Sequence, residues 1–241
     1  TNTTGDSNVA VGHAALYTNN GANNVAVGRG SMFANTTGAD NVSVGMNSLD
    51  ANTTGAGNTA VGKNALTTNT TAENNTAVGM DAMYANTTGA DNVAVGHGAM
   101  YANTTGTRNI AIGHDAYDHS DTENDNLAIG YQAMTVNTAG GTQNVAVGNY
   151  ALDALTSGDN NSAFGYGALG SVTTGTLNNA FGKNALFTVT TGSNNVAMGE
   201  NALYTNNASN NTGIGHGALL ANTTGTRNTA IGTNALDAVT T

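Results

Sequence analysis

The sequence predicts an all-β protein built as a parallel β-roll, a β-solenoid of about 14 coils. An Asn-x-Ala-x-Gly segment recurs along the whole chain, an Ala/Ser-Leu/Met pair follows it, and Asn-Thr-Thr-Gly closes many repeats. Of the thirteen intervals between the segment glycines, ten are 17 residues long, two are 16 and one is 18. Such a period is typical of a solenoid, in which each repeat is one coil stacked on the last. Taken as position 0 of each repeat, the glycines are Gly12, Gly28, Gly45, Gly62, Gly79, Gly96, Gly113, Gly130, Gly148, Gly165, Gly182, Gly199, Gly215 and Gly232.

The composition is unlike that of a compact globular domain, so the period has to supply the order. Only 8% of the residues are charged, 5% are aromatic, and Trp, Pro and Cys are absent. Without a period, a chain so rich in Asn, Thr, Gly and Ala would be disordered and prone to β-aggregation. We therefore expect one repeat domain over residues 1–241. The chain begins inside a repeat, at residues 2–5 (Asn-Thr-Thr-Gly), and ends inside one, at residues 235–236 (Ala-Leu), so we expect a segment of a longer fibre; end caps unlike the body of the solenoid are the alternative.

Positions −4 to −1 of each repeat are predicted to form a short strand. Side chains alternate along a strand, so positions −3 and −1 share one face and position −2 lies on the other. Position −1 is always apolar, and position −2 is Ala in twelve repeats. We expect the bulkier −1 side chains to fill the interior and the Ala side chains to form a column outside it.

Position −4 is Asn in every repeat. Stacked at one position, these amides are expected to hydrogen-bond the coils above and below, as Asn ladders do in stacked β-structures. Ligand binding is the alternative role. The predicted ladder consists of Asn8, Asn24, Asn41, Asn58, Asn75, Asn92, Asn109, Asn126, Asn144, Asn161, Asn178, Asn195, Asn211 and Asn228.

The glycine at position 0 is expected to turn the chain with a positive φ. A second short strand is predicted after it, with Ala or Ser at +3 and a buried Leu, Met or Tyr at +4. Asn-Thr-Thr-Gly at +7 to +10 is turn chemistry, in which the Gly takes the left-handed corner. At a strand spacing of ~4.8 Å, the coils would form a rod of roughly 65–70 Å.

The small, uncharged residues at −2 and +3 favour close approach of another chain. An outer column of Ala lets a neighbouring backbone come near, so we expect one sheet to pack against copies of the same chain. The residues by themselves leave a dimer and a larger oligomer open.

The repeat core resembles that of a known family of fibres. Residues 110–116 (Ile-Ala-Ile-Gly-His-Asp-Ala) and 127–133 (Leu-Ala-Ile-Gly-Tyr-Gln-Ala) resemble the repeats of trimeric autotransporter adhesin heads. With its Asn-Thr-Thr-Gly extension, the 17-residue unit is similar to repeats of bacteriophage tail fibres. The resemblance implies a homotrimeric, left-handed β-roll outside the cell that spaces or presents a surface for a host-cell receptor, with a glycan as one candidate. The coils are longer than in the adhesin heads, and phage fibre and bacterial adhesin both stay open.

Several function classes are excluded on composition. The net charge of −10, with five scattered Lys and Arg, argues against nucleic-acid binding. No apolar run is long enough to insert this segment into a membrane. Catalysis needs a nucleophile, a base and an orienting group brought together, and no such set stands out. We expect no enzyme activity and no cofactor.

Two clusters of ligand-type residues are weak candidates for a metal site. His97 and His114 occupy position +1 of adjacent coils, and imidazole suits several transition metals. Residues 115–125 hold five of the fifteen acidic residues, among them Asp115, Asp118 and Asp121. Carboxylates at this density suit calcium, although the spacing of a known calcium loop is missing. Without a metal, the +1 column is a surface position that accepts many residue types, and residues 115–125 form a solvated acidic corner.

Aromatic residues recur at position +5 and are expected to point outward. Exposed aromatic rings can stack on sugars or grip a receptor, and they can equally cover a seam between neighbouring chains. The possible surface contacts are Tyr17, Phe33, Tyr84, Tyr101, Phe187 and Tyr204.

An alternative function is a monomeric solenoid that binds ice or another ligand through ranks of Thr. Thr-Thr pairs stack in five consecutive coils, from residues 36–37 to residues 104–105. The pairs run directly into Gly or Ala at +10, which places them at a corner, and Thr-x-Thr on a strand face is missing. The fibre is therefore the preferred interpretation.

Overall fold

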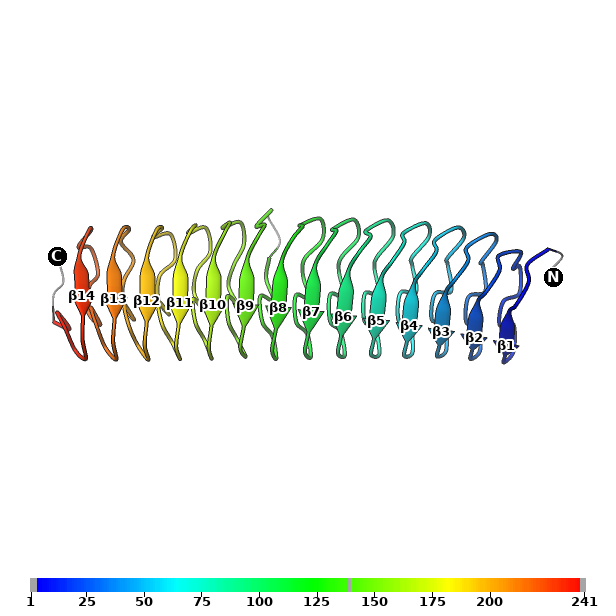
Figure 1. Ribbon diagram of the computed structural model, residues 1–241, viewed down its shortest axis with the longest axis horizontal. Coiled ribbons are helices and arrows are strands. Elements are labelled where there is room, and N and C mark those ends of the chain that lie inside the picture. The colour runs from blue at the N-terminus through cyan, green and yellow to red at the C-terminus, as the bar shows by residue number, and fades with distance from the viewer. Residues whose placement is uncertain (1–3, 138–139, 239–241) are drawn as a thin grey trace. The chain divides into compact units, whose positions relative to one another are not determined.

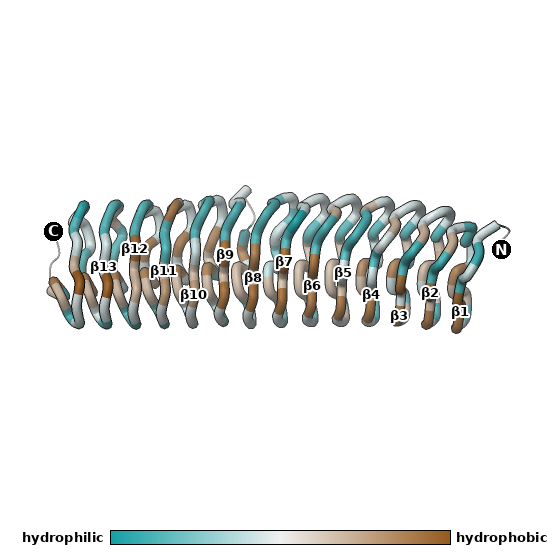
Figure 2. The backbone as a smooth tube through the Cα atoms, viewed as in Figure 1, coloured by the Kyte–Doolittle hydropathy of each residue, from teal (hydrophilic) through white to brown (hydrophobic). Residues whose placement is uncertain are grey.

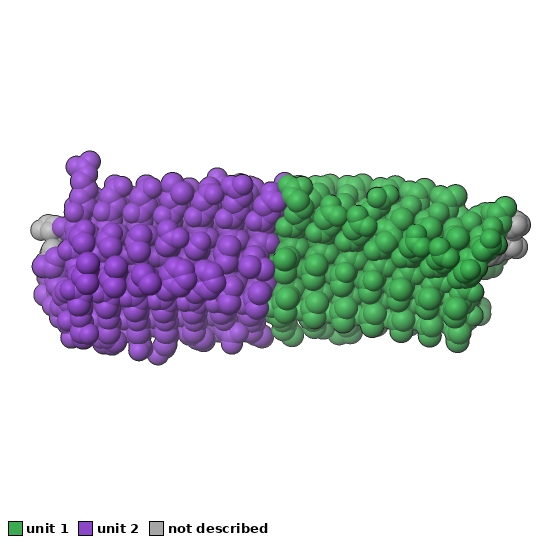
Figure 3. All heavy atoms as spheres, viewed as in Figure 1, with its two compact units in different colours: residues 1–122 green, residues 123–241 purple. Residues whose placement is uncertain are grey.

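A computed structural model describes residues 4–137 and 140–238. Asn2 and Thr3 of the first Asn-Thr-Thr-Gly segment lie outside the described residues. The chain divides into two compact units, residues 1–122 and residues 123–241, which Figure 3 shows in different colours. Each unit is described by itself. Among the described residues there is no helix of the length and apolarity that a membrane crossing requires.

Unit 1 is a parallel stack with one three-residue strand in each coil (Figure 1). The strands pair in sequence order and in register, so that Val93 lies between Thr76 and Ile110 of the neighbouring coils. The strands are β1 (Val9–Val11), β2 (Val25–Val27), β3 (Val42–Val44), β4 (Thr59–Val61), β5 (Thr76–Val78), β6 (Val93–Val95) and β7 (Ile110–Ile112).

Unit 2 repeats this arrangement. Its strands also pair in parallel, in sequence order, with equivalent repeat positions opposite each other. The predicted all-β solenoid with a period of about 17 residues is therefore confirmed. The strands are β8 (Leu127–Ile129), β9 (Val145–Val147), β10 (Ser162–Phe164), β11 (Asn179–Phe181), β12 (Val196–Met198), β13 (Thr212–Ile214) and β14 (Thr229–Ile231).

The predicted second strand at +3 and +4 is wrong, because this part of each coil is a series of turns. The residue at +4 has a φ between 48° and 56° in all fourteen coils, and the residue at +2 is left-handed as well. An extended strand cannot contain such residues. A positive φ is most costly for β-branched side chains, which explains why the large +4 residue is Leu, Met or Tyr and never Val or Ile.

The predicted orientation of the strand side chains is also wrong. The central −2 residue is buried in every strand from β2 to β14, while its neighbours at −3 and −1 are half-buried or exposed. Ala94 is fully buried, for example, and Ile112 in the next strand is 37% exposed. The small side chains therefore face inward, and the bulky ones that were expected in the interior face outward. In Figure 2 the brown hydrophobic segments follow the strands in both units.

The interior is too narrow for bulky side chains on both walls. Where Ser replaces Ala, the Ser31 hydroxyl at +3 donates a hydrogen bond of 2.7 Å to the Ser43 hydroxyl at −2. At Gly213, also at −2, an added Cβ would lie 3.0 Å from the Ala218 carbonyl oxygen and 3.1 Å from Leu203. Between the strand and the turn at +3 and +4, a coil thus packs two small residues, Ala, Ser or Gly, with one larger Leu, Met or Tyr at +4.

The Asn side chains at −4 join each coil to the next. The Oδ1 of Asn58 accepts the main-chain N–H of Asn75 at 2.9 Å, and its Nδ2 donates to the Ala72 carbonyl at 2.9 Å. Asn75 holds the same position in the next repeat, and Ala72 lies in the turn that stacks on Gly55. The equivalent bonds recur along both units, for example from Asn161 to Asn178 and Gly175. Asn58 and Asn161 thus each satisfy two main-chain groups that lie about one turn of the solenoid further along the chain.

A second column of buried Asn was expected only as turn chemistry. At position +7, Nδ2 of Asn52 donates to Oδ1 of Asn35 at 2.8 Å, and Asn69 donates to Asn52 at 3.0 Å. This column is an amide-to-amide ladder inside the coil. In unit 2, Leu155 and other apolar residues fill the same buried position. That exchange of Asn for Leu or Val is the sequence signal that the position is interior.

Glycine is favoured at positions 0 and +10 for two different reasons. At position 0, φ lies between 127° and 145° in all fourteen coils, so the predicted positive φ is confirmed. The Gly at +10, which was expected to be left-handed, has no positive φ in the coils that end Asn-Thr-Thr-Gly within residues 4–137. Glycine is favoured at +10 because the close packing of the next coil leaves little room for a side chain. An added Cβ at Gly38 would lie 2.3 Å from the Gly55 carbonyl oxygen.

Enlarging the inward residue of a strand should destabilise the fold more than enlarging the outward one. We expect Ala94→Val to lower the free energy of unfolding by about 1–3 kcal/mol through overpacking. Val95→Ile is the control, because Ile occupies the same outward position in β7 and β8, and its effect should stay within about 0.5 kcal/mol. Urea titration measures both, and the reverse order would contradict the inward assignment of position −2.

Replacing one Asn of the −4 column should lower the free energy of unfolding by about as much as leaving a buried N–H group unpaired. In Asn58→Ala the main-chain N–H of Asn75 loses its acceptor, whereas the Ala72 carbonyl keeps a bond from Asn69. We expect a loss of about 1–3 kcal/mol in the free energy of unfolding. Asn179→Ser, on the outward side of β11, is the matched control and should change stability little. Equal effects of the two substitutions would contradict the role of the ladder.

Candidate functional site

The outward face of the strands is the most extensive candidate surface. All fourteen −1 residues are apolar, eight of the −3 residues are apolar, and the two columns contain no charged residue. Val44 and Ile112 in unit 1 are each 37% exposed, and Met198 in unit 2 is 44% exposed. Each unit thus presents apolar ranks one strand spacing apart. Large exposed apolar areas of this kind mark sites of interaction.

Sequence reasoning missed this face because it assigned the bulky side chains to the interior. Because the −1 side chains face outward, aromatic residues at this position in adjacent coils stack on the surface. The rings of Phe164 and Phe181, at position −1 of β10 and β11, stack with centroids 4.7 Å apart. The absence of any charged residue at −3 and −1 was a usable signal, although an interior position produces the same pattern.

The predicted +5 aromatics lie on the surface in three stacked pairs. Tyr17 stacks on Phe33 with centroids 5.1 Å apart, Tyr84 stacks on Tyr101 at the same distance, and Phe187 stacks on Tyr204 at 5.5 Å. Tyr17, Phe33 and Tyr101 are exposed, whereas Tyr84, Phe187 and Tyr204 are half-buried. Stacking of adjacent coils brings each pair together, since the two residues are one repeat apart.

Unit 2 carries a shallow hollow of about 330 Å³ beside one of these pairs. Two glycines at positions +2 and +5 of one coil leave it open, and an added Cβ at Gly170 would lie 3.0 Å from the Phe187 ring. Four aromatic rings, a carboxylate and an amide border the hollow, which is the mixture of apolar and polar groups that ligand sites use. The lining residues are Tyr150, Asp153, Tyr166, Gly167, Gly170, Asn184, Phe187 and Tyr204.

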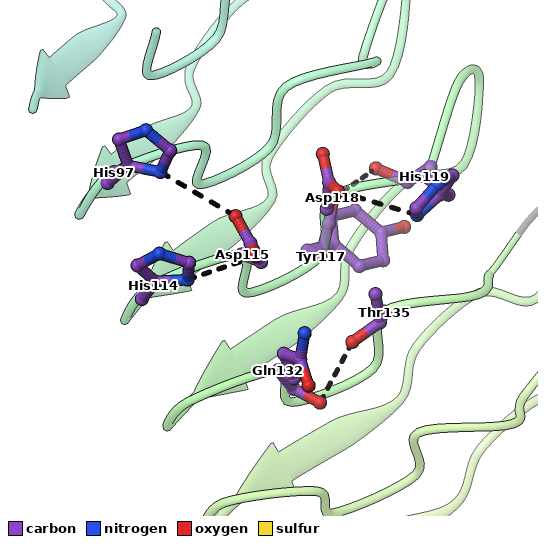
Figure 4. Close-up of polar contacts among 9 residues, drawn as sticks. His97, His114, Asp115, Tyr117, Asp118, His119, Gln132 and Thr135 are labelled. Atoms are coloured by element: carbon purple, nitrogen blue, oxygen red, sulfur yellow. Dashed lines mark hydrogen bonds and ion pairs between the residues drawn. The ribbon is translucent and has the colours of Figure 1, made fainter. Parts of the chain in front are cut away.

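The structure brings together three of the predicted metal-ligand candidates. His97 and His114 follow β6 and β7, and their rings stack with centroids 4.9 Å apart. The carboxylate of Asp115 lies beside both rings (Figure 4), with one oxygen 3.8 Å from Nδ1 of His97 and the other 3.0 Å from Nδ1 of His114. The possible ligand atoms of the three residues all lie within 4.8 Å of one another.

Asp118 lies next to this cluster and is paired with His119 at 3.5 Å (Figure 4). Desolvation by burial raises the pKa of the Asp118 carboxyl above its ordinary value of 3.8, and the nearby Asp115 carboxylate raises it further. The positive charge of a protonated His119 acts in the opposite direction. Burial is the largest of these effects.

The other acidic residues of 115–125 have separate partners. The hydroxyl of Thr104 donates to the Asp121 carboxylate, and the carboxylate of the buried Glu123 accepts the N–H of Gly140 at 3.1 Å. Over the residues that the structure describes, only His97, His114 and Asp115 form a group with metal-ligand spacing. Asp121 and Glu123 therefore take part individually in bonding between coils.

The first Thr of each Asn-Thr-Thr segment is occupied by the neighbouring coil. The hydroxyl of Thr36 donates to the Thr53 carbonyl at 2.8 Å, and that of Thr53 donates to the Thr70 carbonyl at 2.9 Å. The same bond follows at Thr70 and Thr87. These hydroxyls stabilise the stack and leave one Thr per pair to face solvent.

No protein-family model matches this chain, and no curated protein sequence is detectably similar to it.

Removing the desolvated carboxylate of Asp118 should stabilise the protein at neutral pH. Because its pKa is raised on folding, the folded chain binds this proton more tightly, and stability falls as pH rises from 3.8 through the raised pKa. The Asp118→Asn variant has no carboxyl group at this position, so its stability does not fall in this way as the pH rises. Its melting temperature should exceed that of the parent at pH 7, and the difference should vanish below pH 3.8. An equal difference at both pH values would show that the effect is not electrostatic.

Proposed function

We propose that this protein is a structural segment of an extracellular fibre, in which three copies pack as left-handed β-rolls and present a receptor-binding surface. A bacteriophage tail fibre and a bacterial surface adhesin are the two settings that the repeat resembles. The segment itself has no catalytic role in this proposal. Its work is to hold contact surfaces at fixed spacing.

The uncharged apolar face of the strands is the observation that carries the proposal. In water, side chains such as Val44, Ile112 and Phe181 lose the stabilisation that burial would provide, about 25 cal/mol for each Å² of apolar surface. Association with a partner that covers this face would provide that stabilisation. Two small columns, which were first expected to form the contact, are already buried inside the coil.

A copy of the same chain is the partner that fits this face best. The apolar ranks repeat once per coil, and only a partner with the same strand spacing can match them rank for rank. The absence of charge in the −3 and −1 columns allows identical faces to meet without like-charge repulsion. The resemblance to trimeric adhesin heads and tail fibres supplies the number three, and closed symmetry is usual for such oligomers.

The receptor-binding part of the proposal is supported by the surface aromatics. The hollow beside Phe187 and Tyr204 combines ring faces with the carboxylate of Asp153 and the amide of Asn184. Ring faces stack on sugars, and carboxylate and amide groups hydrogen-bond hydroxyls, so a host-cell glycan is a suitable receptor class. The hollow lies on unit 2.

Native mass tests the oligomer directly. Light scattering across a size-exclusion peak should give three times the chain mass of 23.9 kDa. In the double variant Val44→Lys/Ile112→Lys, burial of two charges at the apolar face should convert the trimer to monomers. Thr54→Lys/Thr105→Lys adds the same charges at exposed turn positions and should remain trimeric. A parent protein that is monomeric at all concentrations would overturn the proposal.

A further inference from the structure

The strand spacing places two imidazole rings and a carboxylate on one side of unit 1. His97 and His114 hold the same repeat position in adjacent coils, and their rings are inclined by only 21°. Asp115 follows His114 at position +2, where its backbone is left-handed with a φ of 52°, and its carboxylate faces Nδ1 of both rings from one side (Figure 4). Both His side chains are exposed, so an ion from solvent can reach them.

We propose that His97, His114 and Asp115 bind one divalent transition-metal ion, with Zn²⁺ as the best fit. Zn–N and Zn–O bonds of about 2.0–2.2 Å in a tetrahedron place ligand atoms roughly 3.3–3.5 Å apart. The two His–Asp distances, 3.0 Å and 3.8 Å, lie on either side of this value. Small rotations of exposed side chains complete the geometry. Water occupies the fourth position.

The ligand types decide the class of ion. Imidazole nitrogen suits Zn²⁺, Ni²⁺ and Cu²⁺, whereas Ca²⁺ and Mg²⁺ require sets of oxygen ligands. Among the acidic residues of 115–125 that the structure describes, only Asp115 belongs to the group with ligand spacing. The site is therefore a transition-metal site and does not bind calcium.

The charge around the cluster favours a cation. The carboxylate of Asp118 lies close enough to His97, His114 and Asp115 to interact with all three electrostatically. The imidazoles that bind a metal are neutral and add no positive charge. The bound cation therefore lies near the two carboxylates of Asp115 and Asp118. The two turns that carry the His residues, 96–102 and 113–119, contain no Lys or Arg that would repel it. The ion joins the coil of Gly96 to the coil of Gly113 and adds a cross-link between them.

Calorimetric titration of the full chain with Zn²⁺ in a chelator-free buffer tests the site. We expect one ion per chain and at least about a tenfold loss of affinity in each of His97→Asn, His114→Asn and Asp115→Asn. These variants suit their positions, because Asn149 already occupies +1 and Asn64 already occupies the left-handed +2 position. Unchanged melting temperatures without metal verify that the variants fold.

Two matched controls separate the cluster from general binding by histidine. His216→Asn removes a His from the same +1 column, where the described residues form no second ligand group, and His119→Asn removes the His paired with Asp118. Both should bind Zn²⁺ as the parent does, and Ca²⁺ should give no binding. Absence of Zn²⁺ binding, or equal losses in the controls and in the cluster variants, would overturn the proposal.

Discussion

Main-chain stacking at the strand spacing is the constraint on which the rest of this structure depends. Each coil leaves polar main-chain groups that only the neighbouring coil can satisfy, and the Asn column at −4 does this with two bonds per residue. Asn58 accepts from the N–H of Asn75 and donates to the Ala72 carbonyl, 17 and 14 residues further along the chain. A buried amide without these partners would cost more than it contributes. The coils are therefore held at one fixed separation.

That separation also determines what fits inside. The glycines at 0 and +10 bring backbones so close that a Cβ would collide, as it would between Gly38 and Gly55. The left-handed residues at +2 and +4 fold the second half of the coil tightly against the strand. Apart from the two Asn columns, the interior that remains accepts small residues at −2 and +3, one Leu, Met or Tyr at +4, and in part of unit 2 a Leu or Val at +7. Bulky strand residues consequently lie outside, where they form an apolar surface.

Both proposed interaction sites follow from this geometry. Equivalent residues of adjacent coils come within van der Waals or ligand distance, so a residue type repeated at one position becomes a rank on the surface. Outward Val and Ile become an apolar face, as at Val44 and Ile112, and paired +5 aromatics become stacked rings. His97 and His114, 17 residues apart in sequence, become neighbours that share the Asp115 carboxylate.

The sequence by itself determined the period, the solenoid, a short strand before the glycine, the burial of the +4 residue and the glycine turn, because each depends on local backbone chemistry repeated coil after coil. The strand was predicted at −4 to −1 and lies at −3 to −1. It also placed the two His residues in adjacent coils. Only the tertiary structure decided which strand face is interior. Both faces of Val93-Ala94-Val95 are apolar, so hydrophobicity leaves the choice open, and the narrow interior, set by turns with positive φ at residues such as Met100, selects the Ala side. The same turns decided that the column beginning at Asn19 and Asn35 is buried, because they close the coil around position +7.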